Sequence, residues 1–213
     1  SNGGKNMKRL ENKVAVVTGG ARGIGEAVCE RLCRDGYSVT VNWFHSEEKA
    51  ASLVKRLTES GFDAFAVKAD VSNSADADML ISAAVKRNGR LDVLVNNAGV
   101  AVRSFFDETT DEQWRRVTDT NLTGAFNCAR AASKQMLRQK SGRIINISSM
   151  WGQTGASCEV AYSATKGAIN ALTKALSREV GLSNVTVNAV APGFIDVHSH
   201  NDWFAIHKNP QPY

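Results

Sequence analysis

Residues 13–25 read KVAVVTGGARGIG, and no other stretch of the chain indicates its architecture as clearly. The run from Lys13 to Thr18 is apolar on successive residues, which is typical of a parallel strand buried on both faces. A glycine turn follows and leads into a helical pattern that begins at Gly25. Glycines in this position let the backbone approach a pyrophosphate, and the free N–H groups of the first helical turn bind its charge. The stretch therefore predicts a strand–turn–helix unit that holds a dinucleotide.

Strand and helix patterns alternate along the rest of the chain. Further strand-like runs are Tyr37–Phe44, Phe62–Ala69, Leu91–Asn96, Arg143–Ser148 and Val185–Val190. Helical patterns lie between them at Gly25–Asp35, Glu47–Ser60, Ala75–Asn88, Asp111–Arg138 and Ala161–Val180. Successive strand–helix–strand units need right-handed crossovers, which place helices on both faces of a parallel sheet. We therefore predict a single Rossmann-type, doubly wound α/β domain.

The composition fits a globular domain and argues against several other classes of protein. The chain has 213 residues and a formal net charge of +5, without the basic clusters of a nucleic-acid-binding surface. No apolar stretch approaches the ~20 residues that a membrane span needs. The four cysteines show no CxxC pattern, so we expect them to be reduced and mostly buried, and we predict no metal site. Because nothing resembles a secretion signal, we expect a cytoplasmic protein.

The spacing of the glycine turn is Gly-x3-Gly-x-Gly, at Gly19, Gly23 and Gly25. Together with Asn-Asn-Ala-Gly at 96–99 and Tyr-x-x-x-Lys at 162–166, it resembles the short-chain dehydrogenase/reductase family. The likeness is greatest to the 3-oxoacyl-[acyl-carrier-protein] reductases of fatty acid biosynthesis. It covers residues 8–196 and implies a nicotinamide cofactor and a small carbonyl or acyl-thioester substrate. The cofactor-binding positions that it implies are Gly19, Ala21, Arg22, Gly23, Ile24, Gly25, Trp43, Phe44, Ser46, Asp70, Val71, Asn97, Ala98, Gly99, Tyr162, Lys166, Pro192, Gly193 and Ile195.

Two positions bear on the choice between NAD and NADP. The place where NAD-preferring members of the family carry an acid falls on Trp43, and no acid occurs between Gly36 and Ser46. Arg22 lies inside the glycine turn, where a basic residue accompanies a cofactor with a 2′-phosphate in the family. An acid would repel that phosphate, and a guanidinium would pair with it. We therefore predict NADP(H).

The predicted catalytic residues are Tyr162, Lys166, Ser149 and Asn121. Tyr162 and Lys166 are one helical turn apart and face the same way, and an ammonium beside a phenol assists proton transfer at neutral pH. Ser149 precedes Tyr162 by 13 residues, the family's spacing for the hydroxyl that polarises the substrate oxygen, and Ser148 is the second candidate. The resemblance implies that Asn121 holds a water that links Lys166 to solvent.

The two ends of the chain depart from the family pattern. We expect residues 1–7 to be a disordered leader and residues 197–213 to be an atypical tail. The family continues instead with a substrate-covering segment, a last helix and a seventh strand, so the sixth strand is expected at an open sheet edge. Two hypotheses follow, an active NADPH-dependent ketone reductase and a chain that binds cofactor or a partner subunit with little activity. The resemblance also implies a homodimer or homotetramer.

Overall fold

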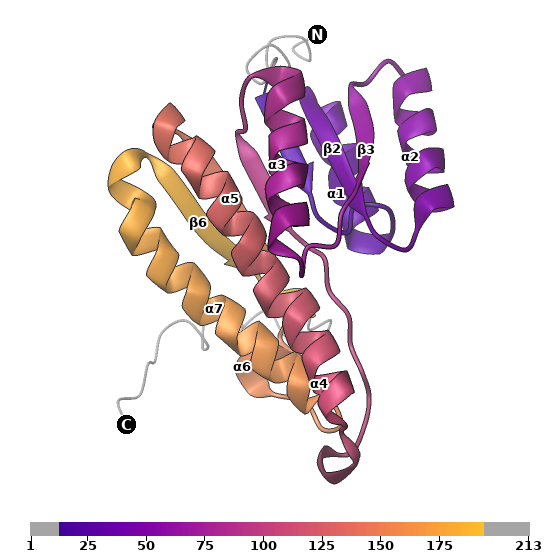
Figure 1. Ribbon diagram of the computed structural model, residues 1–213, viewed down its shortest axis with the longest axis vertical. Helices are drawn as coiled ribbons and strands as arrows, with labels where there is room; N and C mark the ends of the chain where they lie inside the picture. The colour runs from indigo at the N-terminus through magenta and orange to yellow at the C-terminus, as the bar shows by residue number, and fades with distance from the viewer. Residues whose placement is uncertain (1–12, 194–213) are drawn as a thin grey trace, which may run out of the picture.

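The fold is a parallel sheet of six strands with helices on both faces, as a computed structural model describes it for residues 13–193 (Figure 1). The strands, in chain order, are β1 (Lys13–Val17), β2 (Tyr37–Trp43), β3 (Ala64–Lys68), β4 (Val93–Asn96), β5 (Gly142–Ile147) and β6 (Val185–Val190). Their order in the sheet is β3-β2-β1-β4-β5-β6, and every neighbouring pair is parallel. This is the doubly wound arrangement, and the predicted fold class is confirmed.

The helices follow the strands as predicted, with two differences. They are α1 (Gly23–Arg34), α2 (Glu47–Glu59), α3 (Ser74–Asn88), α4 (Asp111–Thr118), α5 (Gly124–Gln139), α6 (Trp151–Thr154) and α7 (Val160–Val180). The helix predicted over 111–138 is divided, because a π-helical turn at Asp119–Thr123 joins α4 to α5. The short helix α6 lies in a segment where no helix was predicted.

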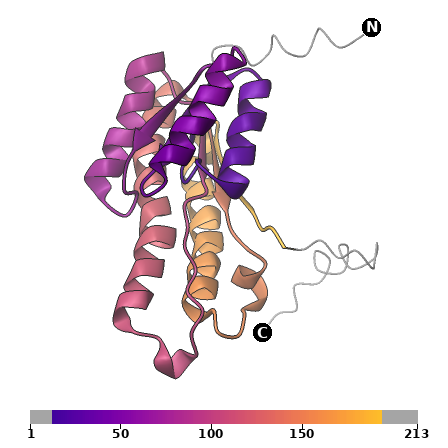
Figure 2. The same ribbon diagram turned by 90° about the vertical axis from the view of Figure 1, so that its right-hand side faces the viewer.

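The sheet is buried between two apolar layers. On one face, Cys29 of α1 and Leu53 of α2 pack against strand residues such as Val39. On the other, Leu80 of α3 and Met136 of α5 pack against residues such as Leu94. Figure 2 shows α1 and α3 on opposite sides of the sheet, and in Figure 1 the long helices α5 and α7 run side by side beyond it.

Buried amides tie the middle of the sheet to the helix layer. Asn96, the last residue of β4, donates from Nδ2 to Asn146 Oδ1 of β5 at 2.9 Å. Asn146 in turn donates to the Thr173 hydroxyl of α7 at 2.9 Å. A network of this kind fixes the relative positions of the elements that it joins, because a buried amide without partners is costly. The ends of β4 and β5 are thereby held against the helix that carries Tyr162.

Several predictions concern the margins of the chain. Within residues 13–193, β6 is the last strand and lies at the edge of the sheet. The leader, the tail beyond residue 196 and Ile195 lie outside the described residues. All four cysteines are free thiols, and Cys158 alone among them is not buried, as expected. No helix within the described range is long and apolar enough to cross a membrane.

Candidate active site

The glycine turn between β1 and α1 is shaped so that only glycine fits at two of its positions. Gly19 has a φ of +59°, and a Cβ there would lie 2.9 Å from the Ala98 Cα. A Cβ on Gly25 would lie 2.4 Å from the Gly19 carbonyl oxygen. The helix start at Arg22 has no capping side chain, which leaves the N–H groups of the first turn to bind an anion. The turn is therefore a cradle that a pyrophosphate can fill.

Asn42, which the sequence analysis did not single out, holds this turn from behind. Its Oδ1 accepts from Gly19 N at 3.1 Å, and its Nδ2 donates to the Ala69 carbonyl at the end of β3 at 3.0 Å. The sequence signal was a lone amide in the apolar run of β2. A buried amide is costly unless it forms hydrogen bonds. An isolated asparagine in a buried strand therefore indicates that its side chain bonds nearby backbone groups.

The ends of β1 and β4 are joined by side-chain bonds at the point where the order of the sheet reverses. Asn97 donates from Nδ2 to the Gly19 carbonyl at 3.0 Å, and Ala98 N donates to the Thr18 hydroxyl at 3.0 Å. Ligands of open α/β sheets bind at such a reversal, outside the carboxyl ends of the strands. The Asn-Asn-Ala-Gly element thus positions the backbone along which a dinucleotide would lie.

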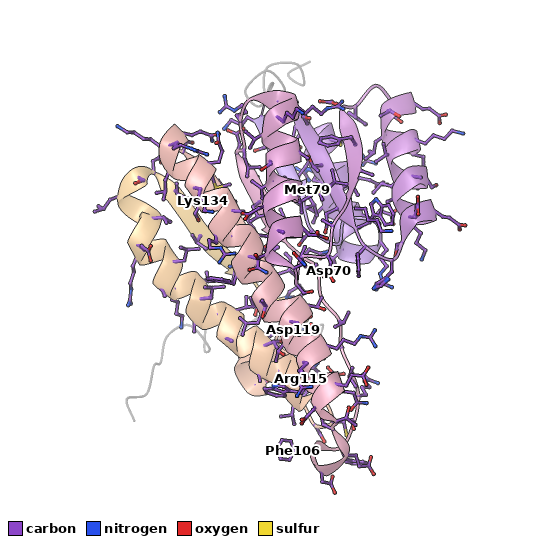
Figure 3. All side chains as sticks on the ribbon, in the orientation of Figure 1. Asp70, Met79, Phe106, Arg115, Asp119 and Lys134 are labelled. Carbon is purple, nitrogen blue, oxygen red and sulfur yellow. The ribbon has the colours of Figure 1, made fainter. Side chains whose placement is uncertain are left out.

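Two cavities open at this end of the sheet, on either side of Val100, which lines both. The first, called here the inner cavity, has a volume of about 480 Å³ and is lined by Ile24, Asn97, Gly99, Val100, Ala101, Ile147, Ser148, Ser149, Trp151, Glu159, Tyr162, Lys166, Pro192 and Gly193. The second, the side cavity, has a volume of about 330 Å³ and is lined by Gly19, Asn42, Phe44, His45, Ala69, Asp70, Val71, Ser72, Ala98, Val100, Arg116, Asp119 and Thr120. Figure 3 shows Asp70 at the sheet end and Asp119 on the long helix below it, which are two walls of the side cavity.

Tyr162, Lys166 and Ser149 meet in the inner cavity. The Lys166 Nζ lies 5.5 Å from the centre of the Tyr162 ring and donates to the Ile147 carbonyl at 2.6 Å. Lys166 is only 5% exposed, and this burial lowers the pKa of its ammonium to about 8. Because the ammonium is hydrogen-bonded to the Ile147 carbonyl and the side chain is buried, the cation has a fixed position beside the phenol.

The two serines at the end of β5 differ in what their hydroxyls do. The Ser148 hydroxyl donates to the backbone carbonyl of Lys166 at 3.3 Å. The Ser149 hydroxyl accepts from the backbone N–H of Trp151 at 3.2 Å, which leaves its own proton to donate into the cavity. Ser149 therefore stays the predicted residue, with Ser148 as the second candidate.

Asn121 lies behind the inner cavity and does not line it. Its Oδ1 accepts from Val100 N at 2.8 Å and its Nδ2 donates to Val100 O at 2.9 Å, so the side chain holds the segment that separates the two cavities. A further bond of 3.3 Å runs from Nδ2 to the Thr165 hydroxyl, next to Lys166. The water-relay role that the resemblance implies for Asn121 stays a prediction.

Most of the predicted cofactor residues lie along the two cavities, and a few do not. Those that line neither cavity are Ala21, Arg22, Gly23, Gly25, Trp43 and Ser46. Gly25 acts through its contact with Gly19, and the Trp43 ring lies under the Lys68 ammonium, 5.3 Å from its centre. Pocket residues that sequence reasoning missed include His45, Arg116 and Trp151. They come from segments after β2, from α4 and from α6, where no motif marks them.

Comparisons with known proteins agree with this arrangement. The family model described as short chain dehydrogenase matches residues 13–206. The chain belongs to the short-chain dehydrogenase family. It is 45% identical over 183 residues to the 3-oxoacyl-[acyl-carrier-protein] reductase FabG of Staphylococcus aureus strain Mu50, an alignment that covers 86% of this chain and 74% of that one.

Two further relatives show the same likeness. The 3-oxoacyl-[acyl-carrier-protein] reductase of Synechocystis is 44% identical over 189 residues, with 89% of this chain and 76% of that one covered. Among solved structures, the crystal structure of gox2181 superposes with a TM-score of 0.83 at 33% identity, covering 87% of this chain and 73% of that one. This short-chain dehydrogenase is accordingly an oxidoreductase of the kind that uses a nicotinamide cofactor.

The residues of the site fit a dinucleotide. The cradle leaves room for a pyrophosphate at Gly19, and two cavities that share Val100 open beside it. No group of three or more His, Cys, Asp or Glu side chains within residues 13–193 could hold a metal ion. The inner cavity is lined by a hydroxyl, a phenol and an ammonium, from Ser149, Tyr162 and Lys166.

Proposed function

We propose that the protein is an NADPH-dependent reductase that converts a ketone into a secondary alcohol. The observation that carries this proposal is the meeting of Ser149, Tyr162 and Lys166 in one cavity at the carboxyl ends of the strands. That cavity shares Val100 with the side cavity beside the glycine turn, so a dinucleotide laid along both would bring its reactive ring to the three side chains. Oxidation of NADPH in the presence of a simple 3-oxo ester tests the proposal.

The reaction divides between cofactor and protein. A reduced nicotinamide bound along the two cavities would supply the hydride for the carbonyl carbon. The Ser149 hydroxyl donates a hydrogen bond to the carbonyl oxygen and polarises it, and the Tyr162 hydroxyl transfers its proton to the same oxygen as the alcohol forms. The Lys166 ammonium, held at the Ile147 carbonyl, stabilises the phenolate that Tyr162 becomes. Solvent then returns a proton to Tyr162, for which Asn121 is the proposed relay residue.

Arg22 is the proposed partner of the 2′-phosphate of NADPH. It occupies the start of α1, and β2 ends in Trp43 without a nearby acid that would repel the phosphate. A hydrogen bond to a charged group is worth ~1.5–3 kcal/mol, which is about 10–150-fold in affinity. We expect Arg22→Ser to weaken NADPH binding by a factor in this range and to leave NADH binding within about twofold. Equal losses for both cofactors, measured by fluorescence titration, would show that Arg22 does not recognise the phosphate.

The pH dependence of the reaction follows from the burial of Lys166. Because burial lowers its pKa to about 8, the side chain carries its charge below that pH and loses it above. Ketone reduction needs the charge, so kcat/KM is expected to fall as pH rises through about 8. Lys166→Arg keeps its charge throughout and should lose this inflection, whatever its absolute rate. A wild-type profile that stays level across that pH would contradict the role of the ammonium.

The substrate class that we propose is a 3-oxoacyl thioester. Support comes from the names of the two reductases above. A third cavity, of about 830 Å³, shares Trp151 with the inner cavity and offers a place for the rest of such a substrate. Acetoacetyl-CoA is the appropriate first substrate, because its thioester can be compared with simple ketones that lack one. The proposed setting is fatty acid biosynthesis.

We also propose that the protein forms a homodimer or a homotetramer through α5 and α7. Phe126 on α5 is 44% exposed, and α7 carries a row of alanines that allows a second helix to approach closely. Exposed apolar surface that gathers in a patch marks a site of protein–protein contact.

A further inference from the structure

Glu159 is a buried acid in the wall of the inner cavity that the proposed reaction does not use. It immediately precedes α7 and comes three residues before Tyr162. The residue is 9% exposed and lines the inner cavity together with Ser149 and Tyr162. Acids are rarely buried to this extent unless they are paired, so its position calls for an explanation.

Glu159 and Trp151 also line a third cavity, the outer cavity, of about 830 Å³. Its other lining residues are Arg103, Ser104, Phe105, Glu108, Gly155, Ala156, Ser157 and Cys158. Glu159 and Trp151 therefore form the boundary that the inner and outer cavities share. A substrate with its carbonyl at Tyr162 and its chain leading to the outer cavity would have to pass these two side chains.

Arg103 pairs with Glu159 from the outer side. Its Nε donates to Glu159 Oε1 at 2.9 Å, while its side chain is 84% exposed. The backbone bond from Ser104 N to the Cys158 carbonyl, at 3.0 Å, fastens the two loops together. The loop that carries Arg103 leaves the end of β4 and continues to the tip of the molecule marked by Phe106 (Figure 3). Glu159 thus lines both cavities, and Arg103 lines the outer one alone.

The charged side chains of the two cavities lie at different distances from the closed end. Lys166 is the cation at the closed end, bonded to Ile147 and adjacent to Tyr162. Glu159 is the carboxylate shared by both cavities, whereas Arg103 and Glu108, of opposite charge, line the outer cavity alone. A carboxylate attached one carbon from the reacting carbonyl would have to lie near Glu159, where like charges in a partly dry cavity repel. A neutral ester or thioester in the same place meets no such cost.

We propose that Glu159, held by Arg103, determines specificity by charge: it admits ketones whose neighbouring acyl group is an uncharged ester or thioester and excludes the corresponding free oxo acids. The inference rests on the proposed reductase function and names the property of the substrate that the site selects. Between two unit charges with protein-like screening, the repulsion corresponds to about a tenfold change in affinity or more.

The experiment compares methyl acetoacetate with acetoacetate as substrates of the wild type and of variants. We expect kcat/KM for the ester to exceed that for the acid, and Glu159→Gln to reduce this preference about tenfold, mainly through KM of the acid. Arg103→Leu leaves Glu159 unpaired and should increase the preference. Glu108→Gln is the matched control, since it removes a carboxylate that lines the outer cavity alone. Its ratio of kcat/KM for the ester to kcat/KM for the acid should stay within about threefold of the wild-type ratio.

A binding measurement separates failure of this inference from failure of the proposed function. With oxidised cofactor present the ketones cannot react, and saturation-transfer NMR then gives their relative binding. If the wild type reduces neither compound, the proposed function fails. The difference in acetoacetate binding between the wild type and Glu159→Gln still tests whether Glu159 selects by charge. The inference is overturned if Glu159→Gln improves neither the kcat/KM nor the binding of acetoacetate. It is also overturned if Arg103→Leu shifts the preference for the ester in the same direction as Glu159→Gln.

Discussion

Replacing Tyr162 with phenylalanine should reduce kcat for ketone reduction about 10³-fold, because a positioned general acid contributes about 10²–10⁴-fold to a rate. The substitution removes one hydroxyl and leaves the ring, which packs beside the Lys166 ammonium. No hydrogen bond to that hydroxyl occurs within the part of the chain that the structure describes, so the melting temperature should stay nearly unchanged. Steady-state kinetics with NADPH and a 3-oxo ester measures the loss.

Two controls make the result specific. Tyr37→Phe removes the same hydroxyl from the first residue of β2, at the opposite end of the sheet, and should leave kcat unchanged. NADPH affinity of the Tyr162→Phe protein should stay within about threefold, since its phosphate-binding cradle is untouched. Activity within tenfold of the wild type would mean that the phenol does not donate the proton.

Replacing Gly25 with alanine should damage both stability and cofactor binding. The new Cβ would lie 2.4 Å from the Gly19 carbonyl and 2.6 Å from the Asn97 amide nitrogen, and neither group can move without breaking the bond that joins them. Overpacking of this kind costs about 1–3 kcal/mol and occasionally more. Because the displaced atoms form the cradle itself, NADPH affinity should fall at least tenfold as well.

Gly181→Ala is the matched control for this substitution. Gly181 follows α7 with helical backbone angles, and a Cβ there would meet no atom within 4 Å. Its unfolding midpoint in urea and its NADPH affinity should match those of the wild type. If Gly25→Ala were as stable as Gly181→Ala and bound NADPH equally well, the close contact between the two ends of the glycine turn would not be needed.

The sequence predicted the parts of the fold whose determinants are local. The apolar strands and the strand–turn–helix unit at 13–25 follow from short-range patterns, and the six-stranded sheet and the helix after β1 confirm them. The division of the long helix at Asp119–Thr123 was not predictable in this way. The π-helical turn contains Asn121, whose side chain is hydrogen-bonded to Val100 in a loop 21 residues away in the sequence.

The same distinction applies to the site. Residues with a fixed spacing, such as Ser149, Tyr162 and Lys166, could be named from the sequence, and they line one cavity. Asn42 and Glu159 could not be named in this way, because their roles depend on contacts with residues far away in the sequence. Asn42 binds Gly19, and Glu159 binds Arg103. Side chains that hold backbone or charge in place carry no spacing signal, and only the folded chain reveals them.

The path of the hydride tests the central claim most directly. We predict that reduction of a 3-oxo ester by NADPH that carries deuterium at both positions of the reactive nicotinamide carbon will place deuterium on the carbinol carbon of the product, with one stereochemistry, as observed by NMR. The Tyr162→Phe variant should yield the same labelled product, only more slowly. Cofactor that binds in the cleft but transfers no deuterium to any ketone would contradict the account and would favour a chain that binds NADPH without using it.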